Sequence, residues 1–470
     1  MGAIREGGAA IPPPLHYAWI IVGLGHLNVL CALGFARFGY TMILPGMKEG
    51  LQLTYAETGW LATGNFVGYL VASLIAGLVA SRRPPRRLIL IALLCLVIGL
   101  GVTSLASGFP SALAARTFTG LASGAVYIPA MALPTLWFAP HRRGLGAGIQ
   151  TGGSGLGLVL SGLQIPVILR WSGPEGWRHA WLLLAILVGV VWILMLALLR
   201  NRPEEIGQHP YGASGVPPPP SAGPARWREV FANPGLWVLG AIYACFGFSY
   251  VIYATFFAAY LVKEGGLSPA AAGQLWGLIG ILSIPSGILW GALADRIGKR
   301  FGLAIVFGLH AACFATFALA RGTTGFLASA ILFGLTAWSI PAIMAAAVGD
   351  YARTSLAAAA LGFITIIFGV GQAIGPPIAG GLADWTRSFS GAFLLASGVA
   401  LVGCLGALFL RHPAQTTPRA PVSDSDIRQR QGFGSRGCLR LPSSLSEFAV
   451  AVGGWVRRRR GGRGGGRSPW

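Results

Sequence analysis

Long apolar runs, each followed by a short polar loop, make up most of the chain. A helix needs about 20 apolar residues to cross a hydrocarbon core that is about 30 Å thick. Twelve runs reach this length, and we expect a membrane-spanning helix in each of them. The expected spans are 17–45, 56–81, 87–107, 110–138, 144–170, 177–200, 234–262, 270–294, 301–320, 324–351, 356–382 and 389–411.

A polar, proline-rich stretch interrupts this pattern after the sixth run. Residues 201–233 include PYGASGVPPPPSAGP, which cannot form a membrane helix and is typical of a flexible linker. The predicted fold is therefore an all-α membrane protein with twelve transmembrane helices in two six-helix bundles, 17–200 and 234–411. The flanking residues, 1–16 and 412–470, are expected to be an N-terminal segment and a disordered, basic tail.

The composition agrees with a membrane protein. Hydrophobic residues make up 54% of the 470 residues and charged residues only 10%, whereas a soluble protein has about 25% charged residues. The net charge of +21 resembles that of a nucleic-acid-binding protein, but the bases lie mainly in short loops and in the tail. That distribution is typical of membrane orientation, so we expect no nucleic-acid partner. Two interpretations of the tail remain: it contacts anionic lipid or nucleic acid, or it is a solvated extension.

The sequence offers little of the chemistry that enzymes use. The six cysteines stand singly, without a CxxC pair, and are interpreted as small core residues. The glycine-rich stretch GIQTGGSGLGLVLSG at 148–162 lacks the GK[ST] ending of a phosphate-binding loop and is interpreted as a helix-packing face. Neither a metal cluster nor the spacing of a catalytic triad is recognisable. We therefore expect no metal, no cofactor and no enzymatic activity.

A charged decapeptide between the eighth and ninth runs occurs twice. GALADRIGKR at 291–300 is partly repeated as GLVASRRPPR at 77–86, which indicates a duplicated architecture. The positions of interest are Gly291, Asp295, Arg296, Gly298, Lys299 and Arg300 in the second copy, and Gly77, Ser81, Arg82 and Arg86 in the first.

The second copy is similar to the G-x-x-x-D-R-x-G-R/K-R motif of the major facilitator superfamily. Arg116, followed by TFTGLASG, resembles the superfamily's fourth-span motif, and GWRHAW and RNRPEEIG resemble segments that flank the sixth span. A finer resemblance, to the YbfB/YjiJ-like branch of bacterial facilitators, is carried by GFARFGYTMILPGM, GNFVGYL, GFSYVIYATFF and GVGQAIGPPIAG. The resemblance implies a monomeric secondary transporter of the bacterial inner membrane, driven by gradients and free of cofactors.

Loop charges predict the orientation of the spans in the membrane. When the N-terminus is placed in the cytoplasm, the inside loops carry more than twice as many lysines and arginines as the outside loops. Positive residues prefer the cytoplasmic side. We therefore expect both termini to be cytoplasmic.

The resemblance also implies that Asp295 holds an inner gate shut. In the superfamily this acid lies against the cytoplasmic end of a helix in the opposite half, which here is the span that begins near Gly144. A carboxylate at the positive end of a helix dipole is stabilised by roughly 0.3–1 kcal/mol. Ser81 replaces the acid in the first copy, so we expect a weaker latch there. The alternative is that Asp295 only pairs with Arg296.

Charged residues inside the spans are costly and point to function. The interior bases are Arg37 and Arg116, and no Asp or Glu lies deep within a span. Arg37 either faces a central cavity or reaches toward the outer surface. Arg116 is a candidate for substrate contact, while the resemblance links it to proton coupling or helix contacts. Two arginines without a carboxylate favour a small organic anion.

Other residues could line the same cavity or hold helices together. His26 is a candidate for titration, although a lone histidine in a helix is more often a packing residue. The remaining substrate-site candidates are polar or aromatic: Asn28, Asn65, Tyr69, Tyr127, Gln150, Tyr250, Tyr253, Trp338 and Gln372.

The predicted function is therefore secondary active transport of a small solute, with an organic anion as the favoured class, by alternating access between the two bundles. The expected partners are the substrate, the lipid bilayer and either a coupling proton or an exchanged anion. Efflux of drugs or amphipathic compounds by proton antiport is the alternative within transporters. A membrane sensor that keeps the fold without transporting is the alternative from another class.

Overall fold

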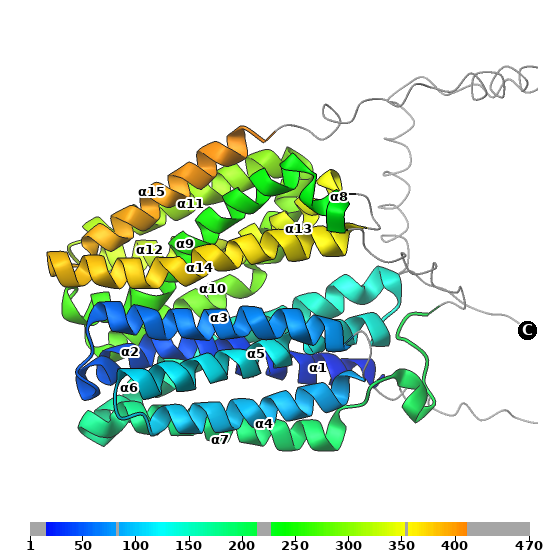
Figure 1. Ribbon diagram of the computed structural model, residues 1–470, viewed down its shortest axis with the longest axis horizontal. Helices are drawn as coiled ribbons and strands as arrows, with labels where there is room; N and C mark the ends of the chain where they lie inside the picture. The colour runs from blue at the N-terminus through cyan, green and yellow to red at the C-terminus, as the bar shows by residue number, and fades with distance from the viewer. Residues whose placement is uncertain (1–15, 81–83, 214–226, 353–355, 411–470) are drawn as a thin grey trace, which may run out of the picture. The chain divides into compact units, whose positions relative to one another are not determined.

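The computed structural model describes residues 16–80, 84–213, 227–352 and 356–410 (Figure 1). Eleven helical segments in this part of the chain are long and apolar enough to cross a membrane. One of them, Pro140–Leu198, contains two helices, α6 and α7, so the described chain has twelve such passes. Their ends agree with the predicted spans to within a few residues, which confirms the all-α, twelve-helix prediction.

The first group of helices begins with a pass that is only partly α-helical. Its middle, η1, is a π-helix that joins α1 to α2 without a loop. The bounds in this group are α1 Ala18–Val29, η1 Leu30–Phe38, α2 Gly39–Gly50, α3 Tyr55–Ala80, α4 Pro85–Ser104, α5 Phe109–Trp137, α6 Arg143–Ser172 and α7 Gly176–Leu198.

The second group has one pass that is divided at Trp338 into two shorter helices, α12 and α13. The bounds in this group are α9 Pro234–Lys263, α10 Pro269–Ile297, α11 Lys299–Leu319, α12 Thr323–Thr336, α13 Ser339–Tyr351, α14 Ala357–Thr386 and α15 Ser390–Leu408.

Several of these helices begin where the sequence places a cap and a proline. Pro234 follows Asn233, whose side chain accepts a 2.9 Å hydrogen bond from the backbone N–H of Gly235. Pro269 follows Ser268, whose hydroxyl accepts from the N–H of Ala271. Proline fits the first turn because its missing N–H would have no partner in the helix.

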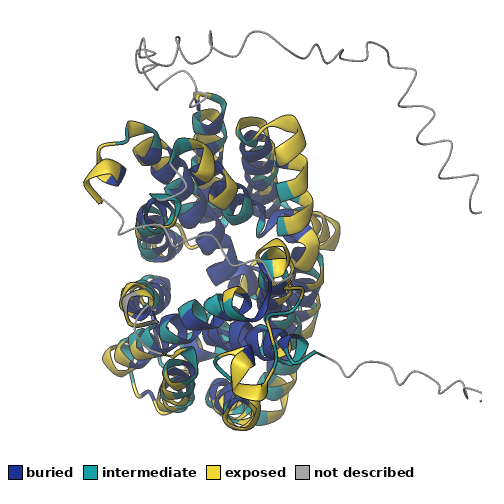
Figure 2. Ribbon diagram, turned by 90° about the vertical axis from the view of Figure 1, so that its right-hand side faces the viewer, coloured by how far each residue is buried: buried dark blue, intermediate teal, exposed yellow. Residues whose placement is uncertain are grey.

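The exposed residues lie on the outward faces of both groups (Figure 2), and many of them are large and apolar. Large aliphatic side chains such as Ile91, Ile193 and Val402 are more than half exposed. In a soluble protein, exposed apolar surface of this extent would cause association. On helices of this length it is the surface that contacts lipid.

The first part of the linker, residues 201–213, contacts the first group of helices. Tyr211 donates its backbone N–H to the carbonyl of Trp137 at 2.8 Å, and its carbonyl accepts from Ala139 at 3.0 Å. The ring of Tyr211 also packs against Trp19 and lies beneath the guanidinium of Arg142. Tyr211 thus connects residues 201–213 to α1 and to the end of α5, residues 214–226 lie outside the described residues, and the flexible linker stays a prediction.

Most of the contact between the groups is made by two helix pairs, α3 with α14 and α6 with α10, and α2 also contacts α9. We call the end of the helices that carries Asp384 the Asp384 end, and the opposite end, with the decapeptide, the Asp295 end. Toward the Asp384 end the backbones nearly touch: a Cβ placed on Gly59 would lie 2.4 Å from the carbonyl oxygen of Pro376. On the second pair, a Cβ on Gly162 would lie 2.4 Å from the carbonyl oxygen of Gly273.

The same helix pairs separate toward the Asp295 end. Gly77 on α3 and Gly362 on α14 each have no described atom within 4 Å of an added Cβ, and the same holds for Gly144 on α6 and Gly291 on α10. The two groups of helices therefore contact each other from the Asp384 end to the middle of the bundle and lie apart at the Asp295 end.

Candidate substrate site between the two groups of helices

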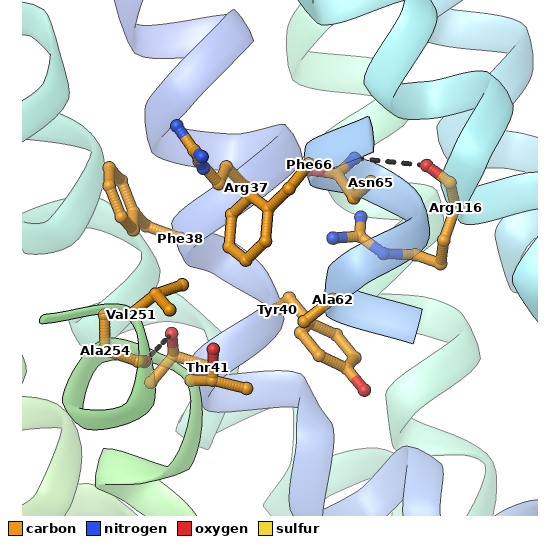
Figure 3. Close-up of a pocket in the computed structure, with 11 residues that line it drawn as sticks. Arg37, Phe38, Tyr40, Thr41, Ala62, Asn65, Phe66, Arg116, Val251 and Ala254 are labelled. Carbon is orange, nitrogen blue, oxygen red and sulfur yellow. Dashed lines mark hydrogen bonds between the residues drawn. The ribbon is translucent and has the colours of Figure 1, made fainter. Parts of the chain in front are cut away.

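A small cavity lies where the two groups meet in the middle of the structure (Figure 3). Its volume is about 10 Å³, roughly the space that one water molecule needs. The lining side chains thus leave little free space between them. The lining residues are Arg37, Phe38, Tyr40, Thr41, Ala62, Asn65, Phe66 and Arg116 from the first group and Val251, Ala254 and Thr255 from the second.

Arg37 lines the cavity from the π-helix η1. Its guanidinium carbon lies 4.2 Å from the centre of the Phe66 ring and 5.1 Å from that of Tyr69. Its Nε and Nη2 are buried and have no hydrogen-bond partner within the described chain. Cation–π contacts offset only part of the cost of removing a guanidinium from water. Of the two positions that the sequence left open, Arg37 takes the one that faces the cavity.

Arg116 enters the same cavity from α5 and is more tightly held. Only 1% of the residue is exposed, and its Nη1 donates a 2.7 Å hydrogen bond to the carbonyl of Ala36. The guanidinium lies 4.8 Å from the ring centre of Tyr40 and 4.9 Å from that of Trp181. Part of its bonding capacity is therefore used to join α5 to the first pass, and its Nε is the buried N–H that lacks a partner.

The cavity is electropositive. Its lining contains two guanidinium groups, and none of its described lining residues is a carboxylate. The unpartnered N–H groups of both arginines are donors, and so are suited to an acceptor-only ligand. A carboxylate or another oxyanion matches this charge and this set of donors.

Four of the predicted site residues gather beside Arg37. Tyr69 and Tyr127 lie with their ring centres 6.0 Å apart, and both are close enough to Arg37 to interact with it electrostatically. Tyr250 is also within this range, and Gln372 donates a hydrogen bond from Nε2 to its hydroxyl. The second group of helices thus contributes polar groups close to the arginine of the first.

Two further predicted residues complete this surrounding. Asn65 lines the cavity and donates from Nδ2 to the carbonyl of Arg116 at 3.1 Å. Trp338, at the break between α12 and α13, packs its ring 5.5 Å from that of Phe38. Its backbone N–H donates to the hydroxyl of Ser286, so the broken helix is tied to α10.

Four predicted site residues lie elsewhere, because they face neighbouring helices. His26 donates from Nδ1 to the carbonyl of Ile149 at 2.7 Å, which supports the packing interpretation. The amide of Asn28 contacts the sulfur of Met195 on α7. Gln150 packs against Gly25 of α1. Tyr253 is enclosed by the phenylalanines of the second group, and its hydroxyl pairs with Ser329 at 3.1 Å.

The sequence analysis singled out three of the eleven lining residues, and three of those that it missed are informative. Tyr40 and Thr41 follow Arg37 by three and four positions and so lie on the same helix face. That spacing was a usable signal. Phe66 lies beside Asn65 and has no polar group, so only its contact with the Arg37 guanidinium marks it as part of the site.

The decapeptide at the Asp295 end forms an ion pair that the sequence analysis did not predict. Lys299 binds Asp350 at the end of α13, with Nζ and the carboxylate 2.8 Å apart. Asp295 is exposed, and no hydrogen bond or ion pair to another described residue involves it. Neither the contact with the helix that begins near Gly144 nor the pair with Arg296 is present in this conformation. Since this end is open, the latch stays a prediction for the closed state.

The other positions of the two copies are described only in part. Arg86 donates from Nη2 to the carbonyl of Leu196 and thus holds the beginning of α4 against the end of α7. Gly298 has a positive φ of 92°, which allows the sharp turn between α10 and α11. Ser81 and Arg82 lie outside the described residues. Arg296 and Arg300 are exposed beside Asp295.

Twelve apolar helices around a small central cavity, with the two groups apart at one end, define a membrane transporter of the facilitator class. The family model described as "Uncharacterised MFS-type transporter YbfB" matches residues 29–408, and the chain belongs to this family within the major facilitator superfamily. This confirms the resemblance that the motifs carry.

Curated relatives cover nearly the whole transporter length. The chain is 25% identical to the hexuronate transporter of Bacillus subtilis (strain 168), over 82% of this chain and 94% of the relative. It is 24% identical to the probable sulfoacetate transporter SauU of Cupriavidus necator, over 86% and 96%. The crystal structure of a bacterial homologue of the human lysosomal transporter Spinster, inward-facing and unoccupied, has the same fold, with a TM-score of 0.66 and 16% identity over 85% of this chain and 96% of that one.

Proposed function

We propose that this chain is a secondary active transporter that carries a small organic anion by alternating access. The observation that carries the proposal is the pair of arginines, Arg37 and Arg116, in a central cavity whose described lining lacks a carboxylate. Burying two positive charges without a counter-ion is costly. A substrate carboxylate would remove much of that cost, and the protein would therefore favour anions over cations.

Arg37 is the proposed ligand of the substrate carboxylate, and Arg116 is its support. The Nε and Nη2 groups of Arg37 have no partner, and they lie on one edge of the guanidinium, where a carboxylate can accept two parallel bonds. Arg116 already donates to the carbonyl of Ala36. Tyr250 and Gln372, on the other group of helices, would contact the remainder of the bound molecule.

The relatives give independent support for this substrate class. Hexuronate and sulfoacetate, the compounds named for the two curated relatives, are both organic anions. At about a quarter identity, these names support the class of substrate and leave its identity to experiment.

The conformation supports the alternating-access part of the proposal. The helix pairs α3–α14 and α6–α10 are in contact at the Asp384 end and apart at the Asp295 end. With the orientation that the loop charges predict, the Asp295 end is cytoplasmic, and the structure is inward-facing. Transport would require the Asp295 end to close and the Asp384 end to open.

The acidic residues of the described chain lie in loops or near helix ends, so a proton-carrying carboxylate at the centre is not part of the proposal. We propose exchange against a second anion as the energy source. In that case Arg37 would hold either anion in turn, and a counter-anion inside vesicles would drive uptake without a pH gradient.

Counterflow in proteoliposomes tests the proposal. Vesicles loaded with each of a panel of carboxylates are assayed for uptake of the labelled compound, and the corresponding neutral amides serve as matched controls. We expect trans-stimulated uptake of at least one carboxylate and none of its amide. Uptake of amides and carboxylates alike would contradict the anion preference, and uptake that needs a pH gradient would contradict exchange. Absence of flux for every compound would contradict transport.

A further inference from the structure

Asp384, near the end of α14, binds the first residues of a helix in the opposite group. One carboxylate oxygen accepts a 3.0 Å hydrogen bond from the backbone N–H of Tyr55, and the other accepts a 2.8 Å bond from the N–H of Ala56. Tyr55 is the first residue of α3. A single side chain of the second group thus contacts two N–H groups of the first.

The beginning of α3 needs this acceptor. The first N–H groups of a helix have no partner within the helix. Thr54 and Glu57 form a capping box: the Thr54 hydroxyl accepts from the Glu57 N–H, and the Glu57 carboxylate accepts from the Thr54 N–H. The N–H groups of Tyr55 and Ala56 remain, and Asp384 accepts from both. Its negative charge also lies at the positive end of the helix dipole.

The surroundings of this contact are closely packed. The ring of Tyr55 lies 4.6 Å from that of Phe389 on the second group, and the ammonium of Lys263 lies 4.6 Å from the centre of the same Tyr55 ring. Further along the same seam, the Thr63 hydroxyl donates to the carbonyl of Ala373 at 2.6 Å. The contact therefore belongs to a continuous closed interface between α3 and α14.

We propose that Asp384 is the gating residue of the Asp384 end, which it holds closed by capping α3 from across the interface. Opening this end separates α14 from the beginning of α3, so both hydrogen bonds must break. The carboxylate then returns to water and two helix N–H groups lose their acceptor. The proposal rests on alternating access but not on the identity or the charge of the substrate.

The chain contains a matched control for this residue. Glu264, at the end of α9, accepts from the backbone N–H of Phe389 and from the hydroxyl of Ser388, both at 2.7 Å. Its partners are the two residues just before α15, which begins at Ser390, and it lies at the same end. Both partners, however, belong to its own group of helices. Loss of Glu264 removes two hydrogen bonds at this end, and neither of them joins the two groups.

The experiment measures how far the Asp384 end is open. Spin labels are attached at Glu49→Cys and Trp385→Cys, two exposed positions on opposite groups, in the full chain with its native cysteines replaced by serine. Pulsed electron resonance then gives the distance distribution without substrate. Asp384→Asn and Asp384→Ala are compared with Glu264→Gln and with the parent, and thermal unfolding is recorded for each.

We expect the two Asp384 variants to raise the ratio of long to short distances about threefold, with the larger effect for alanine, and Glu264→Gln to leave it unchanged. An unchanged distribution in folded Asp384 variants would overturn the proposal, and so would an equal shift in Glu264→Gln. If Asp384→Asn and Asp384→Ala do not fold, Asp384→Glu serves as the test, and it should retain part of the closed population. Because no substrate is present, failure here is distinct from failure of the anion proposal.

Discussion

The guanidinium of Arg116 is hydrogen bonded, at 2.7 Å, to the carbonyl of Ala36, the residue immediately before Arg37. One buried arginine on α5 thereby fixes the backbone that presents the other. The bond falls within the π-helix η1, whose wider turn occurs often at functional sites. The two arginines therefore have different roles, which mutation can separate.

Replacing Arg37 should weaken substrate binding with little effect on folding. Arg37→Ala removes the proposed charged donors, and loss of a charge-assisted hydrogen bond costs about 1.5–3 kcal/mol, or roughly ten- to a hundredfold in affinity. Arg37→Lys keeps the charge without the fork and should retain part of the affinity. The half-saturating concentration in counterflow measures both variants. Unchanged saturation in Arg37→Ala would contradict its role as the ligand.

Replacing Arg116 should instead lower stability. Arg116→Leu leaves the buried carbonyl of Ala36 without its donor, which costs about 1–3 kcal/mol. Arg116→Lys should recover part of this loss, because the lysine ammonium can donate to the same carbonyl. The recovery is incomplete because an ammonium cannot stack against the rings of Tyr40 and Trp181 as a guanidinium does. The melting temperature in detergent is the measurement. If Arg116→Leu melted like the parent but bound substrate poorly, Arg116 would be a substrate ligand, which would contradict its assignment as a support.

Tyr253 should prove to be a core residue. Tyr253→Phe removes the bond to the Ser329 hydroxyl and leaves the ring among its aromatic neighbours. We expect destabilisation of about 1 kcal/mol and unchanged transport affinity. Thermal unfolding together with counterflow distinguishes this from a substrate contact, which would change the affinity.

A methyl group at Gly380 should obstruct closure of the Asp384 end. An added Cβ would lie 2.2 Å from the carbonyl oxygen of Tyr55, closer than non-bonded atoms approach. Gly380→Ala should therefore favour the open form of this end and slow transport, as labelling of a cysteine inside the seam would show. Gly381→Ala is the control, because a Cβ there meets no atom within 4 Å. Equal behaviour of the two variants would exclude a steric effect.

Asp295→Asn should act on the state that the structure does not show. Asp295 makes no described contact while its end is open, so the variant should leave this conformation equally stable. In the closed state it would lose the predicted attraction to the helix that begins near Gly144, and the outward-open population should fall. Ser81→Ala should have the smaller effect. Equal effects in a spin-label measurement across the Asp295 end would contradict unequal latches.

The helix bounds could be predicted because each span is a simple run of apolar residues. The faces of these helices could not. A span surrounded by lipid and by other helices is apolar on all sides, so a polar residue such as Asn28 or Gln150 gives no sign of its direction. The π-helix also shifts the helical register within the first pass, so positions before Leu30 and after Phe38 do not share the faces that a regular period assigns.

Asp384 illustrates a different limit. In the sequence it is an acid near the end of a span, indistinguishable from a solvated loop residue. Its function follows from the pairing of α14 with the beginning of α3, a contact between positions 328 and 329 residues apart. Arg37 was found because its charge is unusual inside a span, whereas Asp384 has a charge that is ordinary for its place in the sequence.

The backbones of α6 and α10 approach each other closely at two points. Gly155 faces Gly280 there, and Gly162 faces Gly273. Where two helices touch through their backbones, their crossing angle can change without an exchange of side-chain rotamers at that point. The energetic barrier to reorienting the two groups would then arise at the ends of the helices and in the cavity. Evolution could adjust the turnover rate by single substitutions there, while the axis of rotation stays the same.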